Sequence, residues 1–520
     1  MASEATTGAY GLRAGVAERW FTVGVAACAL GLGAFLVATL RQWPPHEDEA
    51  LALFVGRDSL GGLFHTVHSE RGGAPLHFLV AWVVAHLGGG LTALRLASVA
   101  FAVASVPVIA ALAERLAGRR VALVATVLAS ASWLMLFHGV FGRMYSLFLL
   151  TSSLSFLFLL RALERGDGRR WTLWAVATVA ALASHPYGAL MLAAQAVYVL
   201  ARARTARALY AFAAVVLVAA PLWYSDRVLA GRLDVGVAGG GHRVSILGYM
   251  AAVARDASSG FWPVFVAVLV LAAVGWWRLR PEARWLTASV VVVPAAALAL
   301  AHLGRSASPE TRHLIFVLPF FAMAVAAGLV AVLRPPALLA AAVALLVAAE
   351  VAWAWHRTPV RFEGESTARI EARDEAARWL AQTARPDDVL FGYDPLFLRA
   401  WEENRDFPDT VVPRADAKLA ASELRSAGEL GRGVWVLDAG DNNNRPPRSS
   451  IPLRLPQPED AFEGRVFGPY LVLRTRGDTE TPARYLRLAA AAMRLGIEFG
   501  VVDDYVNLRT VLDAEDRISG

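Results

Sequence analysis

Three consecutive acidic residues follow the first long apolar run of the chain. Glu47, Asp48 and Glu49 come directly after the two prolines of RQWPPHEDEA, where the chain has just left a segment long enough to cross a bilayer. A carboxylate at a membrane surface can accept a proton from a hydroxyl group, which is general-base chemistry. The alternative is that these acids only solvate the end of a loop and help to set the topology.

The residues after the acidic cluster are amphipathic. The apolar side chains of LALFV (51–55) are spaced to form one side of a short helix lying on the membrane surface, and 59–72 is a second such piece. His65, His68 and Glu70 lie close together in this second piece, so a divalent metal site is one interpretation. The alternative is that both histidines occupy the exposed face of a surface helix.

Further polar residues interrupt apolar runs later in the chain. They are Arg143 and Tyr145 in GRMYS, His185 and Tyr187 in SHPYG, and Arg312 and His313 in SPETRH. Arginine suits phosphate because its planar guanidinium stays charged and donates two parallel hydrogen bonds. A surface carboxylate with arginines at the same depth would suit a phosphate leaving group facing a nucleophile. Taken singly, each arginine could instead snorkel to lipid headgroups, and each histidine could be an interhelical hydrogen-bond donor.

The composition indicates which elements must position these side chains. The chain has 520 residues, of which 56% are hydrophobic and only 18% charged, and the mean hydropathy is +0.46. This balance predicts a polytopic α-helical membrane protein. The expected spans are 20–40, 74–88, 93–114, 121–138, 145–162, 171–184, 187–201, 207–224, 261–277, 285–303, 313–333 and 336–355. A single cysteine, Cys28, excludes a disulfide framework.

The arginines in the connections predict the topology. Arginine-rich connections at 114–120, 161–170, 201–207 and 278–284 belong in the cytoplasm by the positive-inside rule, so the formal net charge of +6 gives no reason to expect nucleic-acid binding. The outer side then receives 41–72, 137–146, 184–188, 225–260 and 304–313. With twelve spans, the loops 41–72 and 114–120 cannot both lie on the sides that their charges indicate, because one crossing between residues 41 and 120 is missing. We therefore expect about thirteen spans.

The chain changes character near residue 356. We expect a transmembrane domain over 1–356, with its first outer loop at 41–73, and a C-terminal soluble α/β domain over 357–520 that lies outside the cytoplasm. Helices are expected at 374–384, 421–430 and 483–496, strands at 388–393 and 434–440, a strand or hairpin at 466–476, and a loop at 441–450.

Five short motifs occur in an order that resembles a known family. They are Asp48-Glu49-Ala50, Ala74-Pro75-Leu76-His77-Phe78, Arg143-Met144-Tyr145, His185-Pro186-Tyr187-Gly188 and Glu310-Thr311-Arg312-His313. Together they resemble the GT-C superfamily of polyprenyl-phosphate-sugar-dependent glycosyltransferases, in the branch of protein O-mannosyltransferases and aminoarabinose transferases. The resemblance covers roughly residues 20–333. Ala74 replaces a proline of the family pattern, and His313 replaces a tyrosine, which leaves the role of His313 open.

The resemblance implies a function. The enzyme would move a sugar from a polyprenyl-phosphate donor to an acceptor hydroxyl on a glycan, lipid or protein, with inversion, at the outer face of a bacterial plasma membrane. The general base would be Asp48, with Glu49 as the second candidate, and Arg143 and Arg312 would neutralise the phosphate. Tyr145, Tyr187, His185 and His313 would bind the donor. Members with and without a metal exist, so no cofactor is certain and a divalent metal stays open.

Two other functions fit parts of the sequence. A transporter or flippase would place ionisable residues near the bilayer midplane and use broken helices in repeated positions. Here the ionisable residues lie mostly at the ends of spans, and no internal repeat stands out. A non-catalytic membrane scaffold would explain the soluble domain, but it would not explain aspartate, arginine and histidine collecting on the outer side.

Overall fold

The chain folds into two compact units in a computed structural model. The membrane unit comprises residues 1–43, 72–80 and 92–363, and the C-terminal unit comprises residues 44–71, 81–91 and 364–520. Most of the first outer loop, expected to belong with the transmembrane domain, therefore packs with the C-terminal residues. The structure describes residues 2–73, 75–202, 205–232, 245–302, 310–414, 416–438, 461–498, 501 and 504–519.

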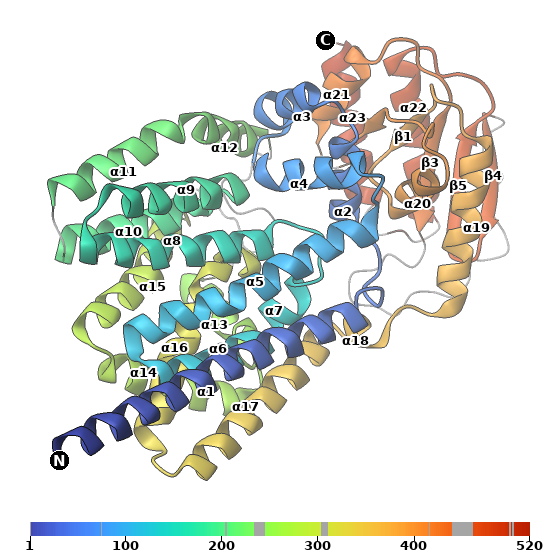
Figure 1. Cartoon of the computed structure of the whole chain (residues 1–520). Coiled ribbons are helices and arrows are strands. Elements are labelled where there is room, and N and C mark those ends of the chain that lie inside the picture. Colours follow the sequence, from blue (N-terminus) through green and yellow to red (C-terminus); the bar gives the residue numbers. More distant parts are fainter. Residues whose placement is uncertain are drawn as a thin grey trace. The chain divides into compact units, whose positions relative to one another are not determined.

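Helices form wherever the sequence predicts a span, because the bilayer core leaves backbone groups no partners except those within a helix. The helices or helix pairs in these places are α1 (Ala2–Ala38), α4 (Pro75–His86), α5 (Leu91–Ala117), α6 (Arg119–Ala131) with α7 (Trp133–His138), α8 (Tyr145–Arg165), α9 (Gly168–Ser184), α10 (Gly188–Arg202), α11 (Ala206–Val218) with α12 (Ala220–Arg232), α14 (Trp262–Arg278), α15 (Pro281–His302), the 3-10 helix η2 (Thr311–Val317) with α16 (Leu318–Val332), and α17 (Pro336–Arg357). Figure 1 shows them coloured along the chain.

The lengths of these helices differ from the expected spans. Within the described residues, six helices are long and apolar enough to cross a membrane, or seven if the pair α11 and α12, bent by 53°, is one span. The other expected spans are shorter helices or are broken, as α6 and α7 are at Ser132. Helix length alone therefore supports six or seven crossings, whereas the expected twelve to thirteen were inferred from the apolar character of the sequence.

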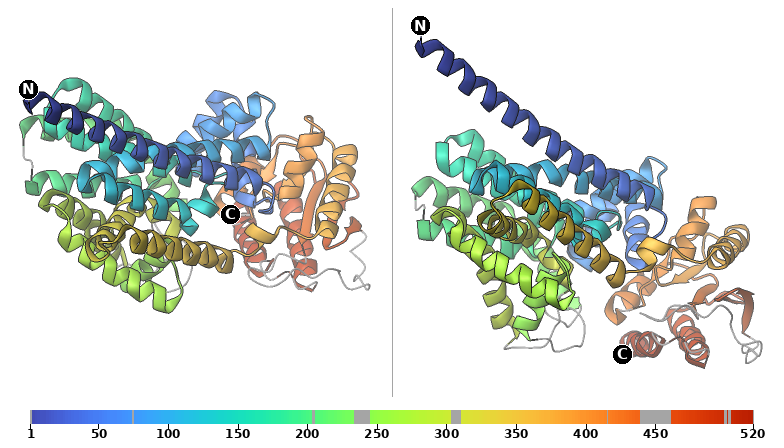
Figure 2. Two further views of the ribbon diagram at one scale, coloured as in Figure 1. Left: turned by 60° about the horizontal axis from the view of Figure 1, so that its bottom comes forward. Right: turned by 90° about the horizontal axis from the view of Figure 1, so that it is seen from below.

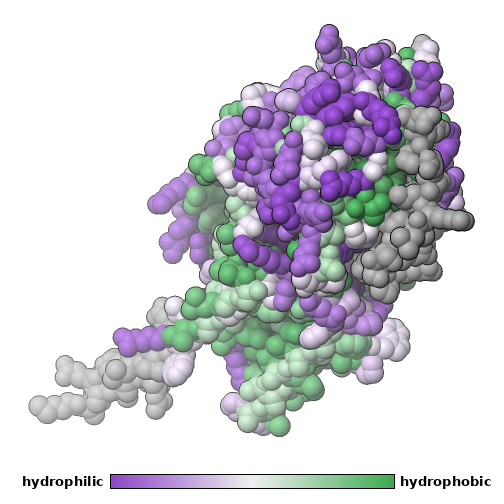
Figure 3. Space-filling model, turned by 90° about the vertical axis from the view of Figure 1, so that its right-hand side faces the viewer, coloured by the Kyte–Doolittle hydropathy of each residue, from purple (hydrophilic) through white to green (hydrophobic). Residues whose placement is uncertain are grey.

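Apolar side chains cover much of the outside of the membrane unit. Trp20, Leu30, Leu217 and Leu345 are 70%, 74%, 74% and 71% exposed, although three of them lie in long apolar helices and Leu217 lies in the bent pair α11 and α12. Such exposure is costly in water and favourable in lipid. Figure 3 shows the same contrast, with hydrophobic side chains on the visible helices of the membrane unit and mainly hydrophilic ones on the C-terminal unit.

Two buried arginines hold the segment that follows α1, a helix that runs along an edge of the helical bundle (Figure 2). Arg95 donates hydrogen bonds to the carbonyl oxygens of Leu40 and Trp43, at 3.2 and 2.7 Å. Arg361 donates one to the carbonyl of Thr39 at 2.7 Å. The arginines therefore fix the point where the chain leaves α1, just before the acidic cluster.

A tight turn makes α8 and α9 an antiparallel pair, which lie side by side in Figure 1. α8 ends at Gly166, whose left-handed φ of 64° suits glycine, and α9 begins after Asp167, whose carboxylate accepts a hydrogen bond from the N–H of Arg170 at 2.9 Å. Because the helices run in opposite directions, the start of α8 lies beside the end of α9. Tyr145 and His185 occupy those two ends.

The C-terminal unit has a sheet with strand order β2-β1-β3-β5-β4. Its strands are β1 (Val389–Phe391), β2 (Val411–Val412), β3 (Gly433–Asp438), β4 (Phe462–Phe467) and β5 (Tyr470–Thr475). β1, β2 and β3 are parallel, whereas β4 and β5 form an antiparallel hairpin, as one of the two expectations for 466–476 had it. Its helices are α19 (Thr367–Thr383), α20 (Pro395–Glu403), α21 (Ala417–Ser426), α22 (Pro482–Glu498) and α23 (Asp504–Ser519), together with α2 (Glu47–Gly56), α3 (Leu60–His65) and the π-helix η1 (Thr66–Arg71) from the first outer loop.

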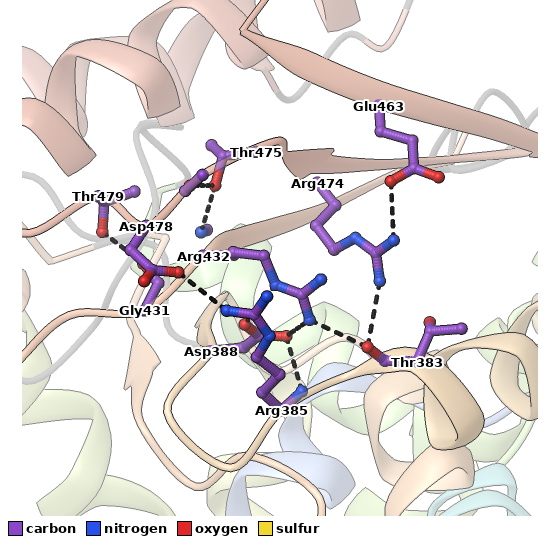
Figure 4. A network of polar contacts seen from close by, with 12 residues as sticks. Thr383, Arg385, Asp388, Gly431, Arg432, Glu463, Arg474, Thr475, Asp478 and Thr479 are labelled. Atoms are coloured by element: carbon purple, nitrogen blue, oxygen red, sulfur yellow. Dashed lines mark hydrogen bonds and ion pairs between the residues drawn. The ribbon is translucent and has the colours of Figure 1, made fainter.

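A buried ion pair ties α19 to the sheet (Figure 4). Arg432 donates hydrogen bonds to both carboxylate oxygens of Asp388, at 2.9 and 2.8 Å, and one to the carbonyl of Thr383 at 2.9 Å. Arg474 of β5 donates to the same carbonyl at 3.2 Å. Asp388 is 0% exposed and Arg432 is 8% exposed. Breaking such a buried pair by removing one partner costs about 3–5 kcal/mol, because the other charge is left uncompensated.

Some expectations fall outside the described residues. The loop expected at 441–450 and Ala74 of the second motif do so entirely. The outer stretches 225–260 and 304–313 do so in part, at 233–244 and 303–309.

Candidate functional site

Four of the six residues expected to bind the donor form one aromatic cluster in the membrane unit. The ring of His313 lies 5.0 Å from that of Tyr187, 5.2 Å from that of His185 and 6.2 Å from that of Tyr145. The rings of Tyr145 and His185 are 5.7 Å apart. Three separate stretches of sequence, the start of α8, the α9–α10 turn and η2, therefore meet at one place.

Arg312 brings a positive charge to this cluster. Its guanidinium carbon lies 5.1 Å from the centre of the Tyr145 ring and 5.9 Å from that of Phe141, and its side chain forms an ion pair with Glu310. A cation over an aromatic face is attracted to it. The Arg312 side chain is 21% exposed, so it is held in place and still reaches the surface of the protein.

Arg143 belongs to the same neighbourhood. Its charge acts on both His185 and His313, and it lies in the short non-helical segment between α7 and α8. All six residues expected to contact the donor thus gather in the membrane unit, and two of them are arginines that carry a permanent charge.

One acidic residue holds η2, which carries Arg312 and His313. Asp256, at the end of α13 (Ile246–Asp256), accepts a hydrogen bond from the hydroxyl of Thr311 at 2.6 Å. The same carboxylate accepts a hydrogen bond from the indole of Trp353 at 3.3 Å and faces Arg357 at 3.5 Å. Burial raises the pKa of Asp256 above its ordinary value, although Thr311 and Arg357 favour the charged form. Asp256 thus links α13, η2 and α17.

Sequence reasoning missed two residues of this region. His138 ends α7 and is 1% exposed, and its ring lies 4.8 Å from that of Tyr145. The signal for His138 was its place at the end of an apolar run, just before GRMYS. Asp256 had a weaker signal, a single acid within a long outer stretch.

The acidic cluster caps a helix in the C-terminal unit. His46 is the N-cap of α2, and its ring nitrogen accepts a hydrogen bond from the N–H of Asp48 at 3.1 Å. The carboxylate of Glu49 accepts a hydrogen bond from the N–H of His46, also at 3.1 Å, which completes a capping box. Glu49 is 0% exposed, whereas the side chain of Asp48 is 30% exposed. The two neighbouring acids therefore have different environments.

The metal candidates lie at α3 and η1. The ring of His65 lies 3.6 Å from the carboxylate of Glu70, and His68 is in η1 between them. Among the described residues, no group of three or more His, Cys, Asp and Glu side chains is arranged to hold a metal ion. A metal at this place stays a prediction without support from the geometry.

The comparisons with known proteins agree with this architecture. Residues 72–224 match the family model "Dolichyl-phosphate-mannose-protein mannosyltransferase", whereas no curated protein matches the chain. The structure is similar to that of ArnT from Cupriavidus metallidurans in the apo state, with a TM-score of 0.55 and 16% identity over 88% of this chain and 98% of that one.

Two further solved structures share the fold. ArnT bound to undecaprenyl phosphate gives a TM-score of 0.52, again at 16% identity over 88% of this chain and 98% of that one. A variant of the arabinofuranosyltransferase AftD from Mycobacteria gives 0.51 at 16% identity, over 89% of this chain and 42% of that one. The partial match to the mannosyltransferase family model and the shared fold are both similarities to membrane glycosyltransferases of the GT-C type.

Proposed function

We propose that this protein transfers a sugar from a polyprenyl-phosphate donor to an acceptor hydroxyl at the extracytoplasmic face of a bacterial plasma membrane, with Asp48 as the general base. The observation that carries this proposal is the meeting of Arg143 and Arg312 with Tyr145, His185 and His313 in the membrane unit of a GT-C fold. The ArnT structure with undecaprenyl phosphate supports the class of donor, because that ligand is a polyprenyl phosphate.

The reaction can be written as a single displacement. The acceptor oxygen attacks the anomeric carbon of the donor sugar while the bond from that carbon to the phosphate oxygen breaks. The electron pair of the broken bond stays on the phosphate, where Arg143 and Arg312 neutralise the growing charge. The proton of the acceptor hydroxyl passes to Asp48. The configuration at the sugar carbon is inverted, and no covalent enzyme intermediate forms.

The environments of the two acids favour Asp48 over Glu49. Glu49 is fully buried, and its carboxylate accepts the hydrogen bond from His46 that completes the cap of α2. To act as a base it would have to give up that bond. Asp48, in the same first turn, keeps an exposed fraction of 30% for its side chain.

Among the expected spans that form one unbroken helix, α4 is the shortest, which favours an odd number of crossings. α4 has 12 residues and so is about 18 Å long at 1.5 Å per residue, well short of the roughly 30 Å of the hydrocarbon core. The other helices described between residues 41 and 90 are shorter still. If α4 does not cross the membrane, the chain makes eleven crossings. The loops before and after α5 then lie on the sides that their charges indicate, and no thirteenth span is needed. An N-terminus inside then puts the C-terminal unit outside the cytoplasm.

A transfer assay tests the role of Asp48. Membranes containing the protein are given radiolabelled polyprenyl-phosphate sugar, and transfer to endogenous acceptor is measured. We expect Asp48→Asn to lower the rate by about 10²–10⁴-fold, the usual contribution of a general base, and to leave donor binding unchanged. Glu47→Gln is the matched control, because it also neutralises an acid of the first turn of α2.

Glu49→Gln separates the two candidates for the base. A glutamine at the third position of the helix can still complete a capping box, so this variant should keep its activity if Asp48 is the base. Normal transfer in Asp48→Asn, or loss of transfer in Glu49→Gln alone, would contradict the proposed role of Asp48.

A further inference from the structure

The C-terminal unit contains a pocket that the proposed reaction does not use. Its volume is about 750 Å³, which is within the range of roughly 300–1,000 Å³ common for small-molecule sites. It is lined by the end of α2, η1, the end of α4, α20, the loop before β2, and α21. Its charged lining residues are Arg57, Arg71, Arg405, Asp58, Asp409 and Glu423.

The charges of this lining are balanced, with three arginines and three carboxylic acids. Arginine only donates hydrogen bonds and ionised carboxylates only accept them, so the lining offers both donors and acceptors. A phosphate or another anion would meet three acids here. A neutral ligand that carries many hydroxyl groups can satisfy both kinds of partner, because each hydroxyl donates and accepts.

Two of the lining arginines, Arg57 and Arg405, are held before any ligand arrives. Arg57 donates hydrogen bonds to the carbonyls of Phe407 and Pro408, at 2.8 and 3.2 Å, and lies 5.2 Å from the centre of the Trp401 ring. Arg405 stacks on the same ring at 3.9 Å and donates to the carbonyl of Gly88 at 3.0 Å. A ligand that binds here would not have to order these side chains, which lowers the entropic cost of binding.

The third lining arginine, Arg71, is also held in place. Arg71 is 6% exposed, lies 4.8 Å from the centre of the Tyr393 ring and donates a hydrogen bond to the hydroxyl of that tyrosine. Glu423 of α21 interacts electrostatically with Arg71. The ring of Phe54 lies 6.0 Å from that of Tyr393, and both rings line the pocket. Sugars need such a mixture of polar and apolar contacts.

One helix connects the pocket to the proposed base. α2 carries Asp48 in its first turn, and Phe54, Val55 and Arg57 at or just beyond its other end line the pocket. Nine residues separate Asp48 from Arg57, which is about 14 Å along a helix at 1.5 Å per residue. This separation exceeds the size of a single sugar ring. A ligand that reached both places would have to contain several sugar residues.

We propose that the pocket binds the distal sugar residues of an oligosaccharide acceptor whose reacting hydroxyl lies at Asp48. The inference rests on the proposed glycosyltransferase function and adds the class of acceptor: a glycan of more than one sugar, not a protein side chain or a simple lipid. Length of the acceptor would then matter, because only a longer glycan fills both ends of the site.

A binding experiment tests the pocket separately from catalysis. Lipid-free oligosaccharides are released by mild acid from the envelope of the cells that naturally make this protein, and are separated by length. They are passed over immobilised full-length Asp48→Asn protein in detergent, and retained species are identified by mass spectrometry. We expect retention of oligosaccharides but not of monosaccharides, and no displacement by excess pyrophosphate.

Variants locate the binding. Arg405→Gln and Asp409→Asn change exposed lining residues, and each should weaken binding roughly 10- to 100-fold, the range for a lost hydrogen bond to a charged group. Arg484→Gln is the matched control, since Arg484 of α22 is 49% exposed and pairs with Glu480 away from the pocket lining. Thermal unfolding of each variant checks that the fold is kept.

The outcomes separate the pocket from the reaction. Retention that is lost in the pocket variants and kept in Arg484→Gln supports the inference. No retention, retention unchanged by Arg405→Gln and Asp409→Asn, or elution by pyrophosphate overturns it, and the proposed function stands if transfer still depends on Asp48. Retention with no transfer in the native membranes would instead overturn the proposed function and leave a saccharide-binding pocket.

Discussion

Asp48 and Glu49 are adjacent in the chain, yet the fold gives them different tasks. The side chain of Glu49 points back to the N–H of His46 and is fully buried, so it stabilises the start of α2. The side chain of Asp48 is partly exposed in the same turn. The negative charge of both also suits the positive end of the helix dipole. An acidic cluster at a helix start can therefore be structural at one position and available for chemistry at the next.

The structural role of Glu49 predicts a stability effect. Glu49→Ala removes the acceptor for the His46 N–H, and losing this part-buried hydrogen bond costs about 0.5–1.5 kcal/mol. Glu49→Gln keeps an acceptor at the same place and should cost less. Thermal unfolding of the purified protein in detergent measures both. Equal melting temperatures for Glu49→Ala and Glu49→Gln would show that the capping box contributes nothing.

Glu423 in the pocket predicts a pH dependence of stability. Burial raises the pKa of Glu423, Arg71 opposes this rise and Glu70 adds to it. Since the folded pKa lies above the unfolded value, the folded state binds the proton more tightly. Its stabilising contribution is complete below the unfolded pKa, at about pH 4, and is lost as the pH rises through the folded pKa.

The variant Glu423→Gln removes this titration. We expect it to be more stable than the parent protein at neutral pH, with the difference shrinking as the pH falls towards the unfolded pKa of a glutamate. Melting temperatures of both proteins across a pH series measure this. A difference that grows on acidification would have the wrong sign and would contradict the effect of burial.

At the scale of elements, the position of η2 depends on a residue from another helix. Thr311, its first residue, donates a hydrogen bond to Asp256, which lies 55 residues earlier in α13. The hydroxyl of Tyr249 donates to the carbonyl of Glu310 at 3.2 Å, so α13 holds the segment twice. The arginine and histidine that follow Thr311 are positioned through these contacts.

Loss of the Asp256 contact should lower activity without touching the donor directly. Asp256→Ala removes the carboxylate that holds Thr311, Trp353 and Arg357, and we expect a roughly 10- to 100-fold lower kcat/KM for the donor, from a loss of about 1.5–3 kcal/mol. Thr311→Ser keeps the hydroxyl and is the matched control. A positioning role also predicts that Thr311→Val reproduces part of the effect. A kcat/KM for Asp256→Ala equal to that of the wild type would exclude a positioning role for Asp256.

The sequence predicted elements better than contacts between them. The apolar ranges marked the membrane helices because an apolar run is a local property of the chain. β2, with two residues, is too short to leave a pattern, and α20 is a single short helix between two strands. The grouping of residues 44–71 with the C-terminal residues depends on pairs more than 300 residues apart, such as Arg57 with Phe407. The hydrophobic periodicity of a sequence is a local pattern, so it cannot reveal a contact between residues so far apart.

The same distinction holds for the candidate site. Arg143, Tyr145, His185, Tyr187, Arg312 and His313 could be selected because polar residues that interrupt apolar runs are costly and so stand out. Asp256 does not interrupt an apolar run, and its role appears only when η2 is folded against α13. The lining of the pocket in the C-terminal unit was equally hidden, because its arginines and acids come from four separate segments of ordinary polar sequence.

For the whole molecule, the topology decides whether acceptor and donor can meet. The proposed reaction needs the C-terminal unit on the side where the polyprenyl-phosphate sugar is presented. Lys418 offers a direct test, because it is the only lysine of the chain and is exposed on α21. A membrane-impermeant amine-reactive reagent should therefore modify the peptide containing Lys418 in intact spheroplasts.

The extent of that modification should not rise when the membrane is permeabilised, since a residue already outside gains no access. Lys418→Arg removes the only side-chain amine and is the control for specificity, and the labelled peptide is measured by mass spectrometry. If Lys418 reacted only after permeabilisation, the C-terminal unit would be cytoplasmic. The number of crossings would then be even, α4 would have to count as a span, and an extracytoplasmic reaction with Asp48 of the C-terminal unit as base would be excluded.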